Sequence, residues 1–332
     1  MKRKISLPPP SPSTCTVTVT PVSGQVYAVT GDITSNTTWY ANAKYLLSGF
    51  VYVKNNAILT IEPGTIIKGV SNTKAAFIVE RGSKIMAAGT AEKPIVFTSD
   101  KAPGSRGYGD WGGLVLCGKA PTNKHDSGAG VGIAEGGIGS LYGGTDAADN
   151  SGVLQYVRIE FPGIGLTATA NSEINGLTMY AVGSGTTIDH IQVSYSGDDS
   201  YEWFGGTVNL KYLVALRGWD DDWDTGNGFI GKVQFFVSLR DPAIADQSTS
   251  NGFESDNDAD GATNDLLQVT SPFNLTAPNF LPVTGSPLLT DASFTHTRLT
   301  NSFFTVVTYK GAFGTTNWTV GWCNFDPQNT VY

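Results

Sequence analysis

Acidic residues recur at a fixed spacing in the middle of the chain. The segment 198–202 (Asp-Asp-Ser-Tyr-Glu) aligns with the segment 220–224 (Asp-Asp-Asp-Trp-Asp), 22 residues later. Carboxyl groups serve as general acids and bases in catalysis and as oxygen ligands for Ca²⁺. If successive repeats lie on neighbouring turns of the backbone, equivalent carboxyl groups stack about 4.8 Å apart and repel one another. Such a stack stays charged only where a cation, a basic side chain or dense hydrogen bonding compensates it.

The first interpretation of this acidic region is a calcium site. Ca²⁺ takes roughly six to eight oxygen ligands, which loops rich in Asp and Asn supply. Residues 256–261 (Asp-Asn-Asp-Ala-Asp-Gly) begin like a calcium-binding loop, although the twelfth position is Leu267 in place of the usual glutamate. Ca²⁺ is therefore the expected cofactor, and the candidate ligands are Asp222, Asp224, Glu254, Asp256, Asp258 and Asp260.

A second interpretation is cleavage of a polysaccharide by a hydrolase or a lyase. Gly197-Asp198-Asp199 resembles the paired-aspartate motif of polygalacturonases, and clustered carboxyl groups supply a general acid and a general base. The sequence has no matching Gly-His-Gly motif, and we expect His190 to be packed or solvated rather than catalytic. In this alternative the catalytic residues are Asp198, Asp199, Glu202, Asp220 and Asp221.

A third interpretation is binding without catalysis. Aromatic side chains lie among the carboxylates, and aromatic faces stack on sugar rings while carboxylates accept hydrogen bonds from sugar hydroxyls. The alternative for each aromatic residue is packing in the core or stacking between repeats. The candidate ligand-binding residues are Tyr201, Trp203, Trp219 and Trp223.

Short strand-like runs must position these residues. Ala57–Ile61 and Thr65–Gly69 alternate in polarity, and Gly or Pro stands at or near their ends. Three further runs, which begin at Ile191, Leu213 and Phe235, are spaced by 22 residues. A period of about 20–25 residues with several strands in each period indicates a β-solenoid, in which each coil buries its inner face against its neighbours. We predict an all-β parallel β-helix with three strands per coil.

The predicted organisation is a single β-helix domain after an N-terminal leader or flexible tether. The tether spans residues 1–24, which are rich in Pro, Ser and Thr, and the β-helix spans residues 25–332. Insertions at residues 119–150 and 259–290 interrupt the pattern, and loops of this length are usually functional or cover a face. The aromatic segment 303–332 is predicted to cap the open end of the solenoid, with an exposed binding platform as the alternative.

Composition limits the classes of function. The chain has 40 Gly among 332 residues and a net charge of −8, which fits many tight turns and disfavours binding to phosphate backbones of nucleic acids. The three cysteines are far apart, which argues against a zinc cluster and against a disulfide-built fold. No run reaches the ~18 apolar residues of a transmembrane helix. Cys15 stands where a lipidated cysteine could anchor the chain.

Five phrases of the sequence together resemble one family. The resemblance is to the secreted, often lipid-anchored parallel β-helix proteins of Bacteroidota-type bacterial surfaces, and it implies a right-handed β-helix placed extracellularly or on the outer cell surface. It supplies no catalytic residues. We therefore expect a non-enzymatic, calcium-stabilised protein for adhesion, glycan contact or assembly, with a surface glycan, a protein or a second copy as partner. The phrases are Ala57–Gly69, Gly109–Gly118, Tyr195–Thr207, Asn251–Asp258 and Phe325–Asn329.

Overall fold

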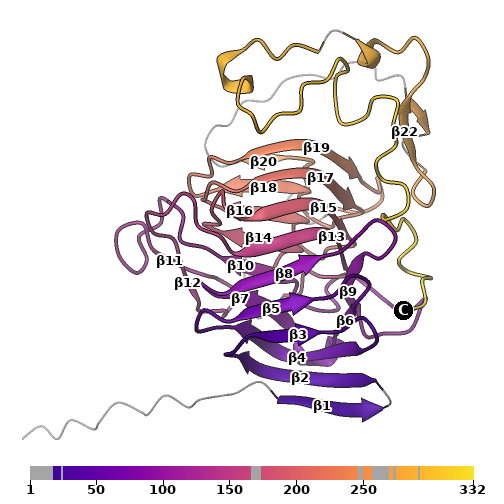
Figure 1. Ribbon diagram of the computed structural model, residues 1–332. Helices are drawn as coiled ribbons and strands as arrows, with labels where there is room; N and C mark the ends of the chain where they lie inside the picture. Colours follow the sequence, from indigo (N-terminus) through magenta and orange to yellow (C-terminus); the bar gives the residue numbers. More distant parts are fainter. Residues whose placement is uncertain are drawn as a thin grey trace, which may run out of the picture.

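Strands stacked in coils account for most of the regular structure. Figure 1 shows them lying one above another from the indigo N-terminal end to the orange coils, so the chain winds as a solenoid. Pairing between coils is parallel, and a full coil contributes one strand segment to each of three faces, called sheet 1, sheet 2 and sheet 3. The predicted parallel β-helix with three strands per coil is thereby confirmed. The computed structural model describes residues 18–23, 25–165, 173–245, 250–255, 269–271, 274–290 and 292–332.

Each sheet combines short strands with halves of longer strands that bend between two sheets. Sheet 1 holds β6 (Ile66–Gly69), β9 (Ile95–Ser99), the first halves of β2 (Val26–Ile33) and β4 (Lys44–Val53), and the second halves of β13 (Gly152–Glu160), β15 (Thr187–Ser194), β17 (Asn209–Leu216) and β19 (Lys232–Leu239). Sheet 2 holds the second halves of β2 and β4 with β7 (Ala76–Val79), β10 (Leu114–Cys117), β14 (Leu177–Tyr180), β16 (Tyr201–Phe204), β18 (Trp223–Gly226) and β20 (Glu254–Ser255). Sheet 3 holds β3 (Thr37–Trp39), β5 (Ile58–Ile61), β8 (Lys84–Ala88) and the first halves of β13, β15, β17 and β19. The remaining elements are β1 (Thr18–Ser23), β11 (Gly132–Ile133), β12 (Leu141–Tyr142), β21 (Val269–Ser271), β22 (Asn279–Pro282) and the 3₁₀ turns η1 (Ser71–Thr73), η2 (Pro287–Leu289) and η3 (Thr297–Leu299).

The bend between sheet 3 and sheet 1 is made by the same backbone conformation in four coils. Tyr156, His190, Tyr212 and Phe235 all have a positive φ, between 49° and 61°. This left-handed conformation is unfavourable for residues with a side chain. The four rings stack in a column with centroids 4.3, 4.4 and 4.9 Å apart, and this ring packing offsets part of the backbone cost. His190 is therefore packed between two tyrosines.

The repeat length varies by one residue between coils. Ile191 pairs with Leu213, as the 22-residue period predicts. Leu213 pairs with Phe236, however, so the predicted alignment of Leu213 with Phe235 is wrong. The reason is a longer turn, because five residues (227–231) separate β18 from β19 where four separate β16 from β17.

Apolar side chains that point inward fill the solenoid. Leu116, Met179 and Trp203 occupy the same position in three successive coils of sheet 2, and each is at most 1% exposed. Side chains alternate between the two faces of a strand, so their neighbours at every second position point outward. The outer face of sheet 2 is consequently free to carry other chemistry.

The insertion at residues 119–150 covers part of that outer face. It projects to one side of the coils and carries β11 and β12 (Figure 1). Ile138 and Tyr142 belong to a buried cluster with Val115 and Tyr180, and the rings of Tyr142 and Tyr180 lie 4.7 Å apart. The insertion is thus attached next to the coils that bear the acidic repeats.

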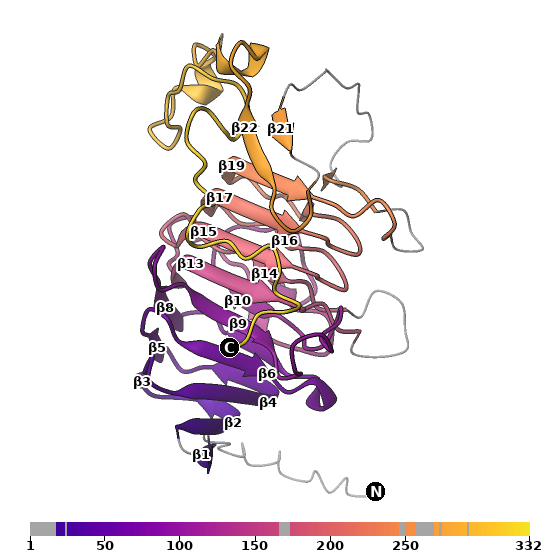
Figure 2. The ribbon, with the colours of Figure 1, turned by 90° about the vertical axis from the view of Figure 1, so that its right-hand side faces the viewer.

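The C-terminal residues turn back along the molecule. Residues 279–290 and 292–310 lie beyond the last coil (Figure 1), so only the first part of the predicted cap, residues 303–310, covers the open end of the solenoid. Residues 313–332, here called the C-terminal strap, then run beside β17, β15 and β13 to end near β9 (Figure 2). Asn324 exchanges two hydrogen bonds with Gln192 on the outer face of sheet 1, of 2.8 and 2.7 Å. The docking of the C-terminal strap along the coils was not predicted from the sequence.

The N-terminal boundary of the β-helix also differs from the predicted one. β1 pairs antiparallel with β2, so a strand lies within the segment 1–24 assigned to a leader or tether. Cys15 lies outside the described residues, and so do residues 259–268 of the second insertion. The rest of that insertion contains β21, β22 and η2. Within the described parts of the chain, no helix is long and apolar enough to cross a membrane.

Candidate functional site

An acidic cleft of about 420 Å³ opens on the outer side of sheet 2. Nine of its twelve lining residues carry a carboxyl group, and no Lys, Arg or His is among the lining residues that the structure describes. The cleft therefore gathers nine of the 29 acidic residues of the chain. The lining residues are Glu135, Glu173, Asn175, Asp198, Asp199, Glu202, Phe204, Asp220, Asp221, Asp224, Asn251 and Glu254.

One row of carboxyl groups follows the strands of sheet 2. Glu202 in β16 pairs with Asp224 in β18, and Asp224 pairs with Glu254 in β20. The three residues form a ladder across three coils, as the repeat predicts. They point outward because their neighbours Tyr201 and Trp203 are buried in the core and successive side chains alternate between faces.

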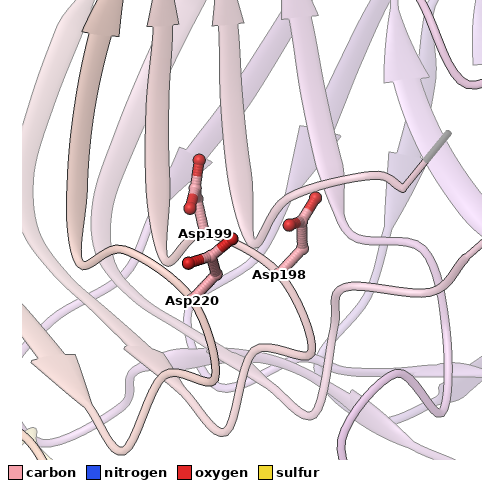
Figure 3. Close-up of side chains that lie close together, drawn as sticks. All are labelled: Asp198, Asp199 and Asp220. Atoms are coloured by element: carbon pink, nitrogen blue, oxygen red, sulfur yellow. The ribbon is translucent and has the colours of Figure 1, made fainter. Parts of the chain in front are cut away.

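A second row lies in the turns that lead from sheet 1 into sheet 2. Asp198, Asp199 and Asp220 come from two neighbouring turns, and Figure 3 shows their carboxyl groups clustered on one side of these turns. The turns are fixed by hydrogen bonds, because the backbone N–H of Asp221 donates to the Asp199 carboxylate (2.9 Å) and that of Ser200 donates to the Asp221 carbonyl (2.8 Å). The predicted juxtaposition of the paired aspartates is confirmed.

Asp199 joins the two rows. One carboxylate oxygen from each of Asp198, Asp199 and Asp220 lies within 4.8 Å of the others. The same holds for Asp199, Glu202 and Asp224. Two three-carboxylate groups therefore share one member, and each has the size of a site for a single metal ion.

Burial and mutual repulsion keep these carboxyl groups from ionising together. The pKa values of Asp198, Asp199 and Glu202 are raised well above the ordinary range, first by burial and then by neighbouring carboxylates. Burial, together with a hydrogen bond to Glu254, raises the pKa of Asp221 to about 8. Without a cation, the cleft holds protons at neutral pH.

Asn175 supplies a neutral oxygen beside the ladder. It is 3% exposed, and its amide N–H group donates to Glu202. Its side-chain oxygen is buried and has no hydrogen-bond partner among the described residues, and such an orphaned acceptor needs a donor or a cation. Carboxylate and amide oxygens are the ligands that Ca²⁺ prefers, so the residues present fit this ion.

Three of the four aromatic residues predicted to bind a ligand are placed elsewhere. Tyr201, Trp203 and Trp223 are 0 to 3% exposed and belong to the core. The Tyr201 hydroxyl donates to the carbonyls of Ile191 and Val214. None of the three faces the acidic cleft, because they alternate with the outward-facing acids. Trp203 and Trp223 line a separate apolar pocket, and a ligand-binding role for these residues stays a prediction. Trp219 is 40% exposed and does not line the cleft, and its role stays a prediction.

The predicted metal ligands divide into three groups. Asp224 and Glu254 line the cleft. Asp222 does not, because its side chain is fully buried and forms an ion pair with Arg240 (3.0 Å), so its assignment as a cleft ligand is wrong. Asp256, Asp258 and Asp260 lie outside the described residues.

Four cleft residues were missed by sequence reasoning. Glu135 belongs to the insertion at residues 119–150, where the Tyr180 hydroxyl donates to its carboxylate (3.3 Å). Glu173, Asn175 and Asn251 stand in loops between coils. None of the four belongs to the 22-residue repeat, so the only available signal was the expectation that the first insertion covers a face.

The parallel coils, the three sheets and the inward apolar columns define a right-handed parallel β-helix protein. The chain belongs to the pectate-lyase-like β-helix domain family, whose sequence pattern matches residues 31–279. That range contains every residue of the acidic cleft. No curated protein and no solved structure gives a significant match.

Proposed function

We propose that the protein is a non-enzymatic extracellular or cell-surface β-helix protein whose acidic cleft binds Ca²⁺ and, through it, a glycan or protein partner. The observation that carries this proposal is the ladder Glu202–Asp224–Glu254, which lies beside Asp199 and Asp221 in a cleft whose described lining has no basic residue. These carboxyl groups ionise together only when cations enter. A pectate-lyase-like β-helix domain is compatible with surface binding and with polysaccharide degradation.

The ligand chemistry supports a hard cation. All polar lining groups are carboxyl or amide groups, whereas zinc and copper sites are typically built from His and Cys. Because Asp199 belongs to both three-carboxylate groups, it is placed to contact cations on either side. Asn251 and Glu254 of the cleft lining are exposed, so a partner could bring hydroxyl or carboxylate groups to an ion bound beside them.

Calcium titration after removal of metals with EDTA tests the proposal. We expect saturable heat in calorimetry and a higher melting temperature with Ca²⁺. Ligand at about 100 times Kd stabilises by about 2.7 kcal/mol, which corresponds to a rise of roughly 5–10 °C for a domain of this size. Asp224→Asn should abolish most of both signals, because Asp224 stands in the middle of the ladder.

Glu92→Gln is the matched control. Glu92 is exposed and does not line the cleft, yet its substitution changes the net charge by the same amount. It should bind Ca²⁺ like the wild type. Absence of binding by the wild-type protein, or equal losses in the two variants, would refute the calcium site.

Glycoside hydrolysis is the second candidate. The oxygens of Asp199, Glu202 and Asp224 lie within 4.8 Å of one another, near the roughly 5 Å that separates carboxyl groups in retaining glycosidases. Their raised pKa values suit a general acid. A lyase is less well supported, since the described lining contains no basic side chain to remove a proton. Release of reducing ends from polysaccharides that Asp199→Asn abolishes would favour the hydrolase over our proposal.

Surface placement is a separate part of the proposal. Cys15 is the candidate lipid anchor, and Cys15→Ser should release an anchored protein from the membrane fraction. Labelling of intact cells with an antibody against the β-helix tests exposure directly. Labelling only after the cells are broken would count against placement on the outer surface.

A further inference from the structure

A second pocket lies at the N-terminal end of the β-helix, in its first coils. It has a volume of about 280 Å³, at the lower end of the roughly 300–1,000 Å³ of small-molecule sites. Its walls come from β2, β3, β4 and the turn between β3 and β4, so it is separate from the acidic cleft on β16, β18 and β20. The lining residues of this N-terminal pocket are Gln25, Tyr27, Thr37, Thr38, Trp39, Tyr40, Asn42, Ala43 and Tyr45.

Aromatic rings form one side of the N-terminal pocket. Trp39 stacks on Tyr45 with centroids 4.6 Å apart and an interplanar angle of 14°. Tyr27 stacks on Tyr45 in turn, at 5.9 Å and 23°. Trp39 and Tyr45 are at most 4% exposed, so the core holds them rigidly, whereas Tyr27 is half-buried and Tyr40 is 53% exposed. Two of the four rings thus remain open to a ligand.

The rim of the pocket is polar but uncharged. Gln25, Thr38 and Asn42 are exposed and offer amide and hydroxyl groups. No Asp, Glu, Lys or Arg is among the described lining residues, in contrast to the acidic cleft. The rim can therefore donate hydrogen bonds to a ligand and accept them from it, but it offers no charge.

We propose that the N-terminal pocket binds one or two residues of an uncharged sugar chain. Ring faces of a sugar stack on aromatic side chains, and its hydroxyls both donate to and accept from amides and hydroxyls. This site is independent of calcium and of the acidic cleft.

Titration with neutral and charged oligosaccharides tests the proposal. The probes are cellohexaose, mannohexaose and a hexamer of galacturonic acid, added to the full chain in EDTA so that the acidic cleft holds no Ca²⁺. Tryptophan fluorescence and calorimetry should show saturable binding of at least one neutral probe and none of the charged one. Binding of the charged hexamer alone, or of no probe, would overturn the assignment.

Two variants place the binding in this pocket. Tyr40→Ala removes an exposed ring and should weaken binding about tenfold, while the melting temperature stays constant. Tyr27→Ala removes the other accessible ring of the pocket and should weaken binding severalfold. Ile230→Ala, which removes a 68% exposed apolar side chain outside the pocket, should bind like the wild type. Undiminished sugar binding by Tyr40→Ala would refute the proposal. The proposal would also fail if the pocket bound a proline-rich peptide with the sequence of residues 6–14 but bound no sugar.

Discussion

Asp221 is a carboxylic acid that keeps its proton at neutral pH. It is 3% exposed, and burial together with its hydrogen bond to Glu254 raises its pKa from 3.8 to about 8. The neighbouring Asp199 and Glu202 also have raised pKa values, because both are buried and lie next to other carboxylates. Proton and cation therefore compete for the same oxygens, which links the stability of the metal-free protein to pH.

Stability in EDTA should fall as the pH rises from about 5 to about 8. In this window the folded protein retains a proton on Asp221 that the unfolded chain, with a pKa of 3.8, has already released. The stabilisation is complete below the unfolded pKa and is lost as the pH passes the folded pKa. Differential scanning calorimetry across this range should show a shallower slope for Asp221→Asn. Calcium should raise the melting temperature more at pH 8 than at pH 5, and an identical slope in the variant would contradict this assignment.

The repeat allowed part of the site to be predicted from sequence. Glu202 and Asp224 were aligned correctly because both belong to the 22-residue repeat, which the parallel register preserves. The same strands also show why Tyr201 and Trp203 do not face the acidic cleft: an outward Glu202 requires its two neighbours to point inward. Asn175 could not be predicted, because it comes from a loop whose position depends on the whole coil.

At the scale of elements, Gly152 permits a close contact between β13 and β8. Gly152 begins β13 with a φ of +115°, and a Cβ atom at this position would lie 1.9 Å from the carbonyl oxygen of Ile85 in β8. The pairing of β13 with β8 begins at this contact. A side chain there would displace the start of β13 in the coil that follows the first insertion.

Gly152→Ala should destabilise the fold by at least roughly 3 kcal/mol, through both backbone strain and the clash with β8. Gly49→Ala is the matched control, because Gly49 also has a positive φ (+65°) but a Cβ there meets nothing within 4 Å. Its expected cost is roughly 1–2 kcal/mol, from the left-handed conformation alone. Urea denaturation of both variants measures the difference, and equal costs would show that the contact with Ile85 is unimportant.

At the scale of the whole molecule, the C-terminal strap joins distant parts of the sequence. The Tyr332 hydroxyl donates to the buried carboxylate of Glu160 (2.5 Å), which Thr98 also contacts. The guanidinium groups of Arg106 and Arg158 lie over the Tyr332 ring, 5.2 and 5.8 Å from its centre. This cluster holds the strap on the outer face of sheet 1.

Tyr332→Phe should lower the free energy of unfolding by roughly 1–3 kcal/mol, because the buried Glu160 carboxyl loses a hydrogen-bond donor while the ring packing remains. Val331→Ala serves as the control, since Val331 is 82% exposed and its loss should have little effect. Chemical denaturation monitored by tryptophan fluorescence measures both. A Tyr332→Phe variant as stable as Val331→Ala would mean that this hydrogen bond does not hold the strap.

The fold as a whole was predictable because a β-helix repeats one local pattern, whereas the strap was not. Short runs of alternating polarity and the recurring acidic turns were enough to predict the coils. The strap residue Asn324 has no repeat partner, and its contact with Gln192 spans 132 positions. Pattern reasoning identifies which face of a strand is buried, but it does not identify a distant segment that covers the other face.

The contact between Gln328 and Arg106 spans 222 residues and has a consequence for the order of folding. Coils can nucleate at many points and extend to their neighbours, as in other solenoids. The strap can bind only after the coils that form its docking surface are stacked, and contacts between such distant residues slow folding. Refolding should therefore end with a slow step in which the C-terminal strap docks on the outer face of sheet 1 of the already formed β-helix.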